Sequence, residues 1–142
     1  GWERLPARLK DMPGIELAGF VENISSEYEQ AAVAIAPILS GAGSKIKIIE
    51  ALAHGRPVVA DRHSAEGFPA AMRGEGVVCV DSDAEMAAAC VRLLGRPEEA
   101  ARLGLAGRAH VLASFTRARF EEIVLSDCDR VLHEAAARRR AG

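Results

Sequence analysis

Apolar runs alternate with amphipathic segments along most of the chain, a pattern typical of an α/β domain. Residues 33–38 form a continuous apolar run (Val-Ala-Ile-Ala-Pro-Ile), which predicts a strand buried on both faces. Further strands are expected over residues 15–21, 57–60 and 76–80. Alternation of strands and helices implies right-handed crossovers and a parallel sheet. We therefore expect an α/β fold with about four parallel strands and flanking helices.

Start and stop signals delimit the expected helices. Ser26 with Glu29 predicts a capping box, Asp81-Ser82-Asp83 predicts a cap, and Pro97 is typical of a helix start. Gly55 predicts a left-handed stop. The helices are expected over residues 4–11, 25–32, 44–54, from the cap at 81–83 to 94, from 97 to 103 or beyond, and 116–138. The last one is long, with an apolar stripe of Phe120, Ile123, Val124, Leu125, Val131 and Leu132.

The segment Gly41-Ala-Gly-Ser-Lys-Ile-Lys-Ile-Ile-Glu50 carries the candidate chemistry. A loop of small residues lets a ligand approach backbone N–H groups, and the helix that follows directs its free N–H groups and positive dipole end at an anion. Glu50 lies one or two turns further, where a carboxylate can accept from ribose hydroxyls. This order predicts a site for a phosphorylated nucleoside.

Parallel sheets bind ligands outside the carboxyl ends of their strands. Three expected loops leave those ends, at residues 22–23, 39–43 and 61–68. We expect them to meet at one edge of the sheet and to form one cleft.

Composition narrows the function classes. A chain of 142 residues with 49% hydrophobic residues can bury a core as one domain. The net charge of −2 gives no argument for nucleic acid, and 4% aromatic residues weigh against base-stacking surfaces. Cys79, Cys90 and Cys128 form no CxxC pair and are typical of a reducing, cytosolic compartment. His110 and His133 have no partner at metal-ligand spacing, so we expect no metal site and no resident cofactor.

Several segments together resemble the C-terminal, donor-binding domain of family 4 retaining glycosyltransferases. They are Gly19-Phe-Val-Glu22, residues 28–37, 41–60, Ala65-Glu66-Gly67, Arg102-Leu-Gly104 with Gly107-Arg108, and Phe115-Thr116. The resemblance covers nearly the whole chain in order. It implies a Rossmann-like fold that binds a nucleotide-diphosphate sugar, with the acceptor bound by a separate N-terminal domain. We expect residues 1–142 to be a single but partial copy of the donor domain, inactive alone.

The resemblance also assigns roles to individual residues. Glu50 matches the second of two family glutamates, and the match implies ribose binding. The first glutamate would fall at Ala42, and its absence puts recognition of the donor sugar in doubt. The loop resembles a subset of the family with Gly-Ala-Gly followed by Lys-x-Lys. Backbone N–H groups near its end would face the diphosphate, and the loop after Val21 would border the nucleobase. The implied site residues are Glu22, Asn23, Gly41, Ala42, Gly43, Ser44, Lys45 and Glu50; the resemblance assigns no catalytic residue in this chain.

Each of these residues also has a structural interpretation. Glu50 could be an ordinary exposed helix acid, Ser44 a helix cap, and the glycines a simple turn. Lys45 is the better phosphate partner, while Lys47 suits solvent or a domain interface. His54 is typical of a helix-end cation or packing residue. His63 and Glu66 lie in the expected cleft loop, where either solvation or ligand contact is open.

Three hypotheses follow. The chain is the donor half of a glycosyltransferase, a noncatalytic nucleotide-binding or scaffold domain, or a module for another phosphorylated ligand such as a dinucleotide. No G-x-G-x-x-G follows a first strand, which disfavours the third. With no apolar window long enough to span a bilayer, we expect a cytoplasmic protein that could dock on the inner membrane through the other domain. The nucleobase, donor sugar, acceptor and oligomeric state stay open.

Overall fold

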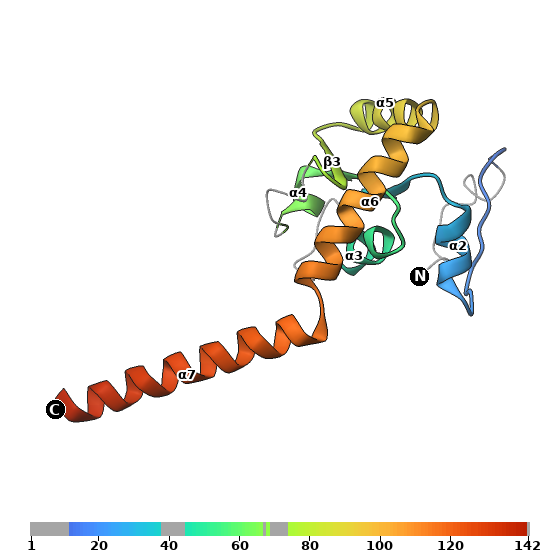
Figure 1. Ribbon diagram of the computed structural model, residues 1–142. Coiled ribbons are helices and arrows are strands. Elements are labelled where there is room, and N and C mark those ends of the chain that lie inside the picture. The colour runs from blue at the N-terminus through green and yellow to red at the C-terminus, as the bar shows by residue number, and fades with distance from the viewer. Residues whose placement is uncertain (1–11, 38–44, 67, 69–73, 142) are drawn as a thin grey trace.

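The computed structural model describes residues 12–37, 45–66, 68 and 74–141, with side chains as far as residue 134. Figure 1 shows a small body of strands and helices from which one long helix projects. The elements in chain order are α2 (Ile24–Gln30), β1 (Ala34–Ala36), α3 (Ile46–Ala53), β2 (Val58–Asp61), α4 (Arg62–Ala65), β3 (Val77–Val80), α5 (Asp83–Leu94), α6 (Pro97–Ser114) and α7 (Arg117–Ala141).

The three described strands form one parallel sheet in the order β1-β2-β3. Ile35 pairs with Val59, and Val59 pairs in turn with Val78. Helices connect the strands, as parallel pairing requires. The α/β prediction is therefore confirmed, and the arrangement is consistent with a Rossmann-like fold. Three strands are present in the described part of the chain where about four were expected.

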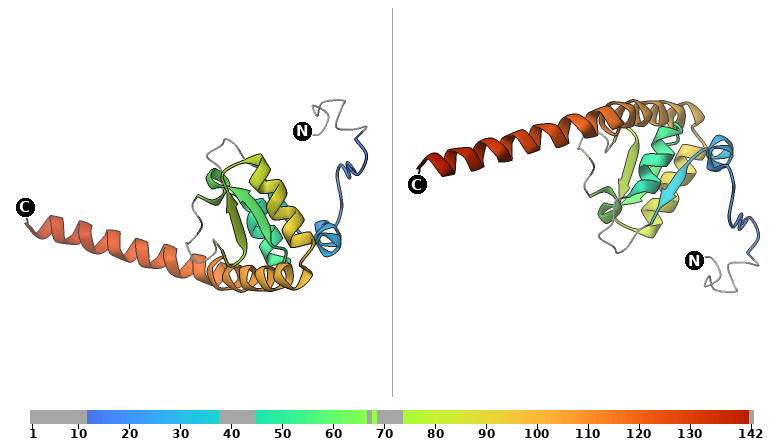
Figure 2. Two further views of the ribbon diagram at one scale, coloured as in Figure 1. Left: turned by 90° about the horizontal axis from the view of Figure 1, so that it is seen from above. Right: turned by 90° about the horizontal axis from the view of Figure 1, so that it is seen from below.

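The central strand β2 is buried on both faces because helices cover each side of the sheet (Figure 2). Successive side chains of a strand point to opposite faces. Val58 and Ala60 accordingly join the core cluster of α3, whereas Val59 joins the cluster of α5 and the first half of α6. The sheet thus separates two cores, one on the side of α3 and one on the side of α5, and α6 contributes to both.

Helix α6 crosses the amino ends of β2 and β3, and two glycines permit this close approach. A Cβ atom on Gly104 would overlap the carbonyl oxygen of Gly55, and one on Gly107 would lie 2.5 Å from Cδ2 of Leu52. Gly76, at the start of β3, faces the backbone of Gly107. The amino edge of the sheet is therefore closed by α6.

The prediction of a strand over residues 15–21 is wrong. These residues form no strand, and Phe20 remains 89% exposed. An apolar run becomes a strand only where a neighbouring strand supplies hydrogen bonds. No described strand pairs with residues 15–21.

Two helix starts differ from their predictions. Helix α2 is capped by Asn23, whose Oδ1 accepts from the backbone N of Ser25 at 3.0 Å, so Ser26 and Glu29 form no capping box. Asparagine is as good a cap as serine, and it lies earlier in the chain. Helix α3 has Lys45 rather than Ser44 as its N-cap residue. The helix expected over residues 4–11 lies outside the described residues.

Three other predicted helix ends are confirmed. Gly55 has a φ of +70°, the left-handed region that favours glycine after a helix. Ser82 caps α5, with its Oγ accepting from the backbone N of Glu85 at 3.2 Å, and Pro97 begins α6.

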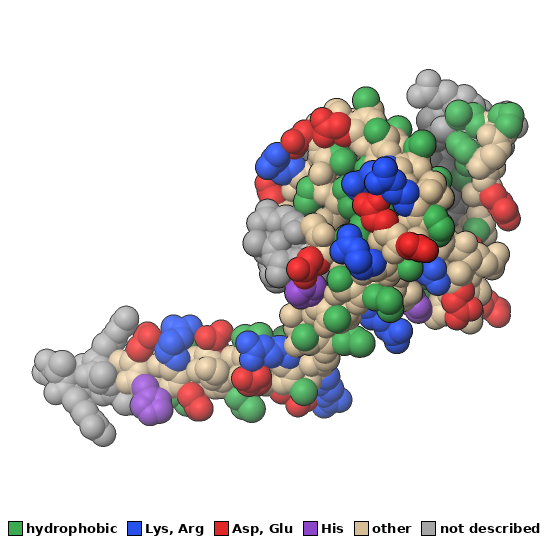
Figure 3. All heavy atoms as spheres, turned by 45° about the horizontal axis from the view of Figure 1, so that its top comes forward, with side chains coloured by type: hydrophobic (Ala, Val, Ile, Leu, Met, Phe, Trp, Pro, Cys, Tyr) green, Lys and Arg blue, Asp and Glu red, His purple; other side chains and the backbone are tan. Residues whose placement is uncertain are grey.

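The long C-terminal helix is confirmed, but its stripe is not covered by the described part of the chain. Phe120, Leu125 and Leu132 are each 66% exposed. Helix α7 projects away from the body in every view (Figures 1 and 2). Figure 3 shows acidic and basic side chains next to one another along it, consistent with ion pairs such as Arg117–Glu121. No helix in the described ranges is both long and apolar enough to cross a bilayer.

Candidate functional site

Within the described part of the chain, the amino end of α3 has neither a side-chain cap nor a first-turn acid to compensate its free N–H groups. Its N-cap residue Lys45 makes no side-chain cap hydrogen bond, and its first turn contains no acid. By contrast, Ser82 caps α5, and α6 carries Glu98 and Glu99 in its first turn. An uncompensated helix amino end favours an anion.

Lys45 connects this helix end to the loop that follows β2. Its Nζ lies 3.5 Å from Nε2 of His63, the second residue of α4, and Nδ1 of His63 lies 3.3 Å from Oε2 of Glu66. A lysine ammonium can only donate. A neutral imidazole with its proton on Nδ1 would satisfy both contacts. The amino end of α3 and the segment that follows β2 are therefore joined by these three side chains.

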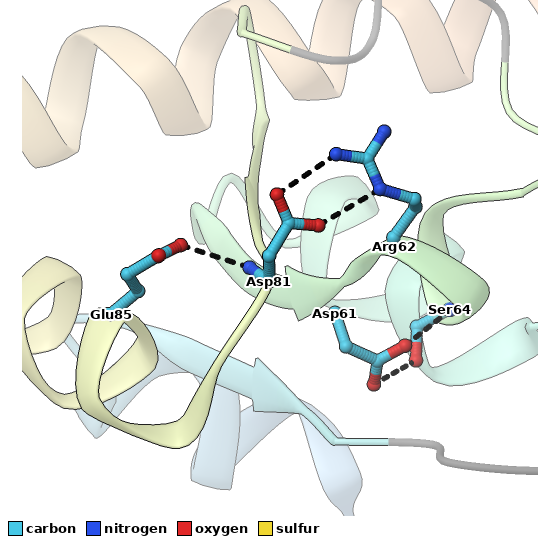
Figure 4. A network of polar contacts seen from close by, with 5 residues as sticks. All are labelled: Asp61, Arg62, Ser64, Asp81 and Glu85. Carbon is cyan, nitrogen blue, oxygen red and sulfur yellow. Dashed lines mark hydrogen bonds and ion pairs between the residues drawn. The ribbon is translucent and has the colours of Figure 1, made fainter.

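A second polar network lies at the carboxyl ends of β2 and β3 (Figure 4). The guanidinium of Arg62 donates to both carboxylate oxygens of Asp81, at 2.8 and 2.9 Å. The hydrogen bond and charge of Arg62 lower the pKa of Asp81, because they stabilise the ionised carboxylate. Oε2 of Glu85 accepts from the backbone N of Asp81 at 2.9 Å, so the strand ends are held in place.

The adjacent residue Asp61 holds α4. Its Oδ1 accepts from the backbone N of Ser64 at 2.7 Å, and its Oδ2 accepts from the Ser64 hydroxyl at 2.8 Å (Figure 4). Ser64 is fully buried, and these bonds satisfy it. This cap therefore fixes the short helix that presents His63 to Lys45.

Glu50 lies on the second turn of α3 and is exposed. One turn further along, the ring of His54 stacks on the ring of Tyr28 from α2, with centroids 4.9 Å apart and planes 13° apart. Burial first, and then the negative charge of Glu50, raise the pKa of Tyr28. The carboxylate of Glu50 is therefore within electrostatic reach of the Tyr28 hydroxyl.

The structure brings only some of the predicted site residues together. Lys45 and Glu50 share α3, while exposed Glu22 and Asn23 precede α2, with Asn23 capping it. No described contact joins either of them to Glu50 directly. The remaining site residues, Gly41, Ala42, Gly43 and Ser44, lie outside the described residues, so their role as a phosphate loop stays a prediction.

Two pockets lined by described residues lie away from Lys45 and Glu50. One of about 180 Å³ is beside Arg56 and Pro97, at the amino edge of the sheet. The other, of about 400 Å³, is between β3 and the side chains of Arg92 and Arg102. Neither is lined by a predicted site residue.

Sequence reasoning gave Tyr28, Arg62 and Asp81 no functional role. Arg62 and Asp81 could have been found by position, because each follows the carboxyl end of a strand. Tyr28 gave one weaker signal: it is the single tyrosine in a chain poor in aromatic residues.

Comparison with known proteins identifies the family of the chain. The family described as glycosyl transferases group 1 matches residues 1–96, a span that contains the three described strands and both Lys45 and Glu50. The chain is also 41% identical over 73 residues to the trehalose synthase of Rubrobacter xylanophilus. That match covers 51% of this chain but 17% of the relative, so the chain spans only a small part of that protein's length. The chain belongs to the glycosyl transferases group 1 family.

Proposed function

We propose that this member of the group 1 glycosyl transferases binds the nucleotide-diphosphate sugar donor of a family 4 retaining glycosyltransferase. In this proposal residues 1–142 form part of a C-terminal donor domain, and a separate N-terminal domain of the same parent protein binds the acceptor. The observation that carries the proposal is the amino end of α3, where the described residues supply neither a side-chain cap nor a first-turn acid, with Lys45 as the N-cap residue and Glu50 on the second turn.

The diphosphate would lie at this helix end. Backbone N–H groups and the ammonium of Lys45 would stabilise negative charge there, and that charge grows as the bond between sugar and diphosphate breaks. His63 would hold Lys45 in place, because it contacts Lys45 from α4, and Glu66 would in turn hold the ring of His63. The acceptor and any proton transfer would come from the N-terminal domain.

The nucleoside would lie along α3 toward Tyr28. Glu50 would accept hydrogen bonds from the ribose hydroxyls, since it is exposed about one helical turn from the diphosphate position. Glu22 and Asn23 would border the base.

Calorimetric titration of the intact parent protein with a panel of nucleotide sugars and dinucleotides tests the proposal. We expect one class of nucleotide sugar to bind and Glu50→Gln to weaken it by about tenfold or more, the usual value of a lost charged hydrogen bond. The matched control is Glu98→Gln, an exposed acid on α6 at the opposite edge of the sheet. Equal affinity in all three proteins, or preference for a dinucleotide, would contradict the proposal.

A noncatalytic nucleotide-binding or scaffold role is the second candidate. Ala42 favours it, because the family resemblance implies a sugar-binding glutamate at that position. The two candidates differ in turnover: a transferase releases nucleoside diphosphate when donor and acceptor are both present, and a binding domain does not. The name of the relative makes trehalose synthesis one of the transfers to assay.

A further inference from the structure

The stacked pair of Tyr28 and His54 joins two elements that each carry part of the proposed nucleotide site. Tyr28 belongs to α2, whose N-cap residue is Asn23, and His54 follows α3, which carries Glu50. The two rings lie nearly parallel, with centroids 4.9 Å apart. The pair therefore bridges the helix after the proposed base loop and the helix that carries the proposed ribose ligand.

Among the described residues, α2 has few other attachments to the body. None of its residues is buried, and the hydrogen bonds of its side chains stay between Asn23 and Gln30. Tyr28 is the residue of α2 that packs against the core cluster of α3. The direction of α2, and with it the position of Asn23, must therefore depend strongly on this one ring.

Helix α3, which leads into His54, is held tightly in the core. Helix α3 buries Ile48 and Leu52 completely, and α6 packs closely against its carboxyl end. His54 is thus presented from an element that cannot easily shift, and Tyr28 transmits that position to α2.

We propose that Tyr28 and His54 are positioning residues that set the distance between the base loop at Glu22-Asn23 and the carboxylate of Glu50. The inference rests on the proposed function, because it assumes that base and ribose bind at these two places. Neither ring needs to touch the diphosphate, so the pair would govern how well a nucleoside is recognised and leave phosphate binding at Lys45 unchanged.

The test compares two ligands on the intact protein. One is inorganic pyrophosphate, and the other is whichever of the adenosine, guanosine, cytidine and uridine diphosphates binds best. Calorimetry gives both dissociation constants for the wild type and for Tyr28→Leu, His54→Ala, His54→Phe and Glu50→Gln. His133→Ala on α7 is the matched control, because the described hydrogen bond of that histidine lies within its own helix, to the carbonyl oxygen of Asp129.

We expect Tyr28→Leu and His54→Ala to weaken nucleoside diphosphate binding by about tenfold or more while pyrophosphate binding stays the same, since a misplaced contact is costly even when the ligand atoms are untouched. His54→Phe keeps a stacking ring and should restore most of the selectivity. A general loss of folding would weaken the binding of both ligands together. The readout is therefore the ratio of the two dissociation constants.

The outcomes separate the two claims. If Glu50→Gln loses nucleoside selectivity but Tyr28→Leu and His54→Ala keep it, the positioning inference is wrong and the proposed function stands. The inference is also overturned if Tyr28→Leu and His54→Ala each weaken the binding of both ligands equally. If no nucleoside diphosphate binds the wild type, both claims fall.

Discussion

Tyr28 reports directly on Glu50, because it is the single tyrosine of the chain. Its pKa is raised by burial and then by the charge of Glu50. Ultraviolet absorbance at alkaline pH should therefore show a tyrosine midpoint above the usual value of about 10. A raised pKa stabilises the fold below the unfolded-state pKa, and this contribution is lost as the pH rises through the folded-state pKa.

Substitution Glu50→Gln should lower that midpoint but leave it above the ordinary value, since burial is the larger cause. The control Glu29→Gln changes an exposed acid next to Tyr28 in the sequence and should leave the midpoint unchanged. A midpoint unaffected by Glu50→Gln would place the carboxylate away from the ring.

Lys45 and Lys47 provide a second residue-scale comparison. Both lie at the amino end of α3, but Lys45 is half-buried against His63 while Lys47 is exposed. We expect Lys45→Met to weaken pyrophosphate binding about tenfold and Lys47→Met to weaken it less, because an exposed lysine is screened and not held in place. Titration at moderate salt measures the difference, and equal losses would remove Lys45 from the proposed site.

Contacts at this scale were the least predictable part of the site. The phosphate-site pattern pointed to Lys45 and Glu50 because both belong to one local segment. The contacts of Lys45 with His63 and of Tyr28 with His54 join residues 18 and 26 positions apart, so they depend on tertiary packing that no local spacing encodes.

At the scale of elements, the crossing of α6 over the amino ends of the strands depends on Gly104. A Cβ atom there would overlap the backbone of Gly55, so the two segments would have to separate. Gly104→Ala should lower the free energy of unfolding by about 1–3 kcal/mol, the usual effect of overpacking. Chemical denaturation measures the change.

Gly95→Ala is the control, since Gly95 has a φ of −79° and a Cβ atom there would make ordinary contacts from 3.4 Å outward. It should change stability little. If both variants were equally stable, α6 would not need its glycine to pack so closely.

Elements with their own local signals were predicted well. Apolar runs, caps or a first-turn proline can be recognised in the local sequence of β2, β3, α5 and α6. Residues 15–21 failed because an apolar run cannot reveal whether a partner strand will pair with it. On α5 the apolar residues Val91 and Leu94 are 70% and 61% exposed, because Ala89 and Leu93 form its buried face.

At the scale of the whole molecule, the α/β body and α7 differ in how much they contribute to stability. Every described side chain of α7 is exposed, and its ion pairs join neighbouring turns of the same helix. A chain ending at Thr116 should therefore melt within a few degrees of the full chain, a shift of about 1 kcal/mol or less. Thermal unfolding followed by circular dichroism measures this.

A chain ending at Arg102 is the matched control. It loses Gly107 and the buried Val111, which packs in the core of α3, and should not fold. If removal of α7 alone were equally damaging, the body would depend on contacts that the described residues do not make.

The central claim is that α3 holds a diphosphate at its amino end while Glu50 binds the ribose. It is tested most directly by comparing a ribonucleoside diphosphate with its 2′,3′-dideoxy analogue on the wild type and on Glu50→Gln. We expect the wild type to prefer the ribose form about tenfold or more and the variant to bind both forms alike, because the lost hydroxyls and the lost carboxylate are partners in one interaction. An equal preference in both proteins would contradict the claim.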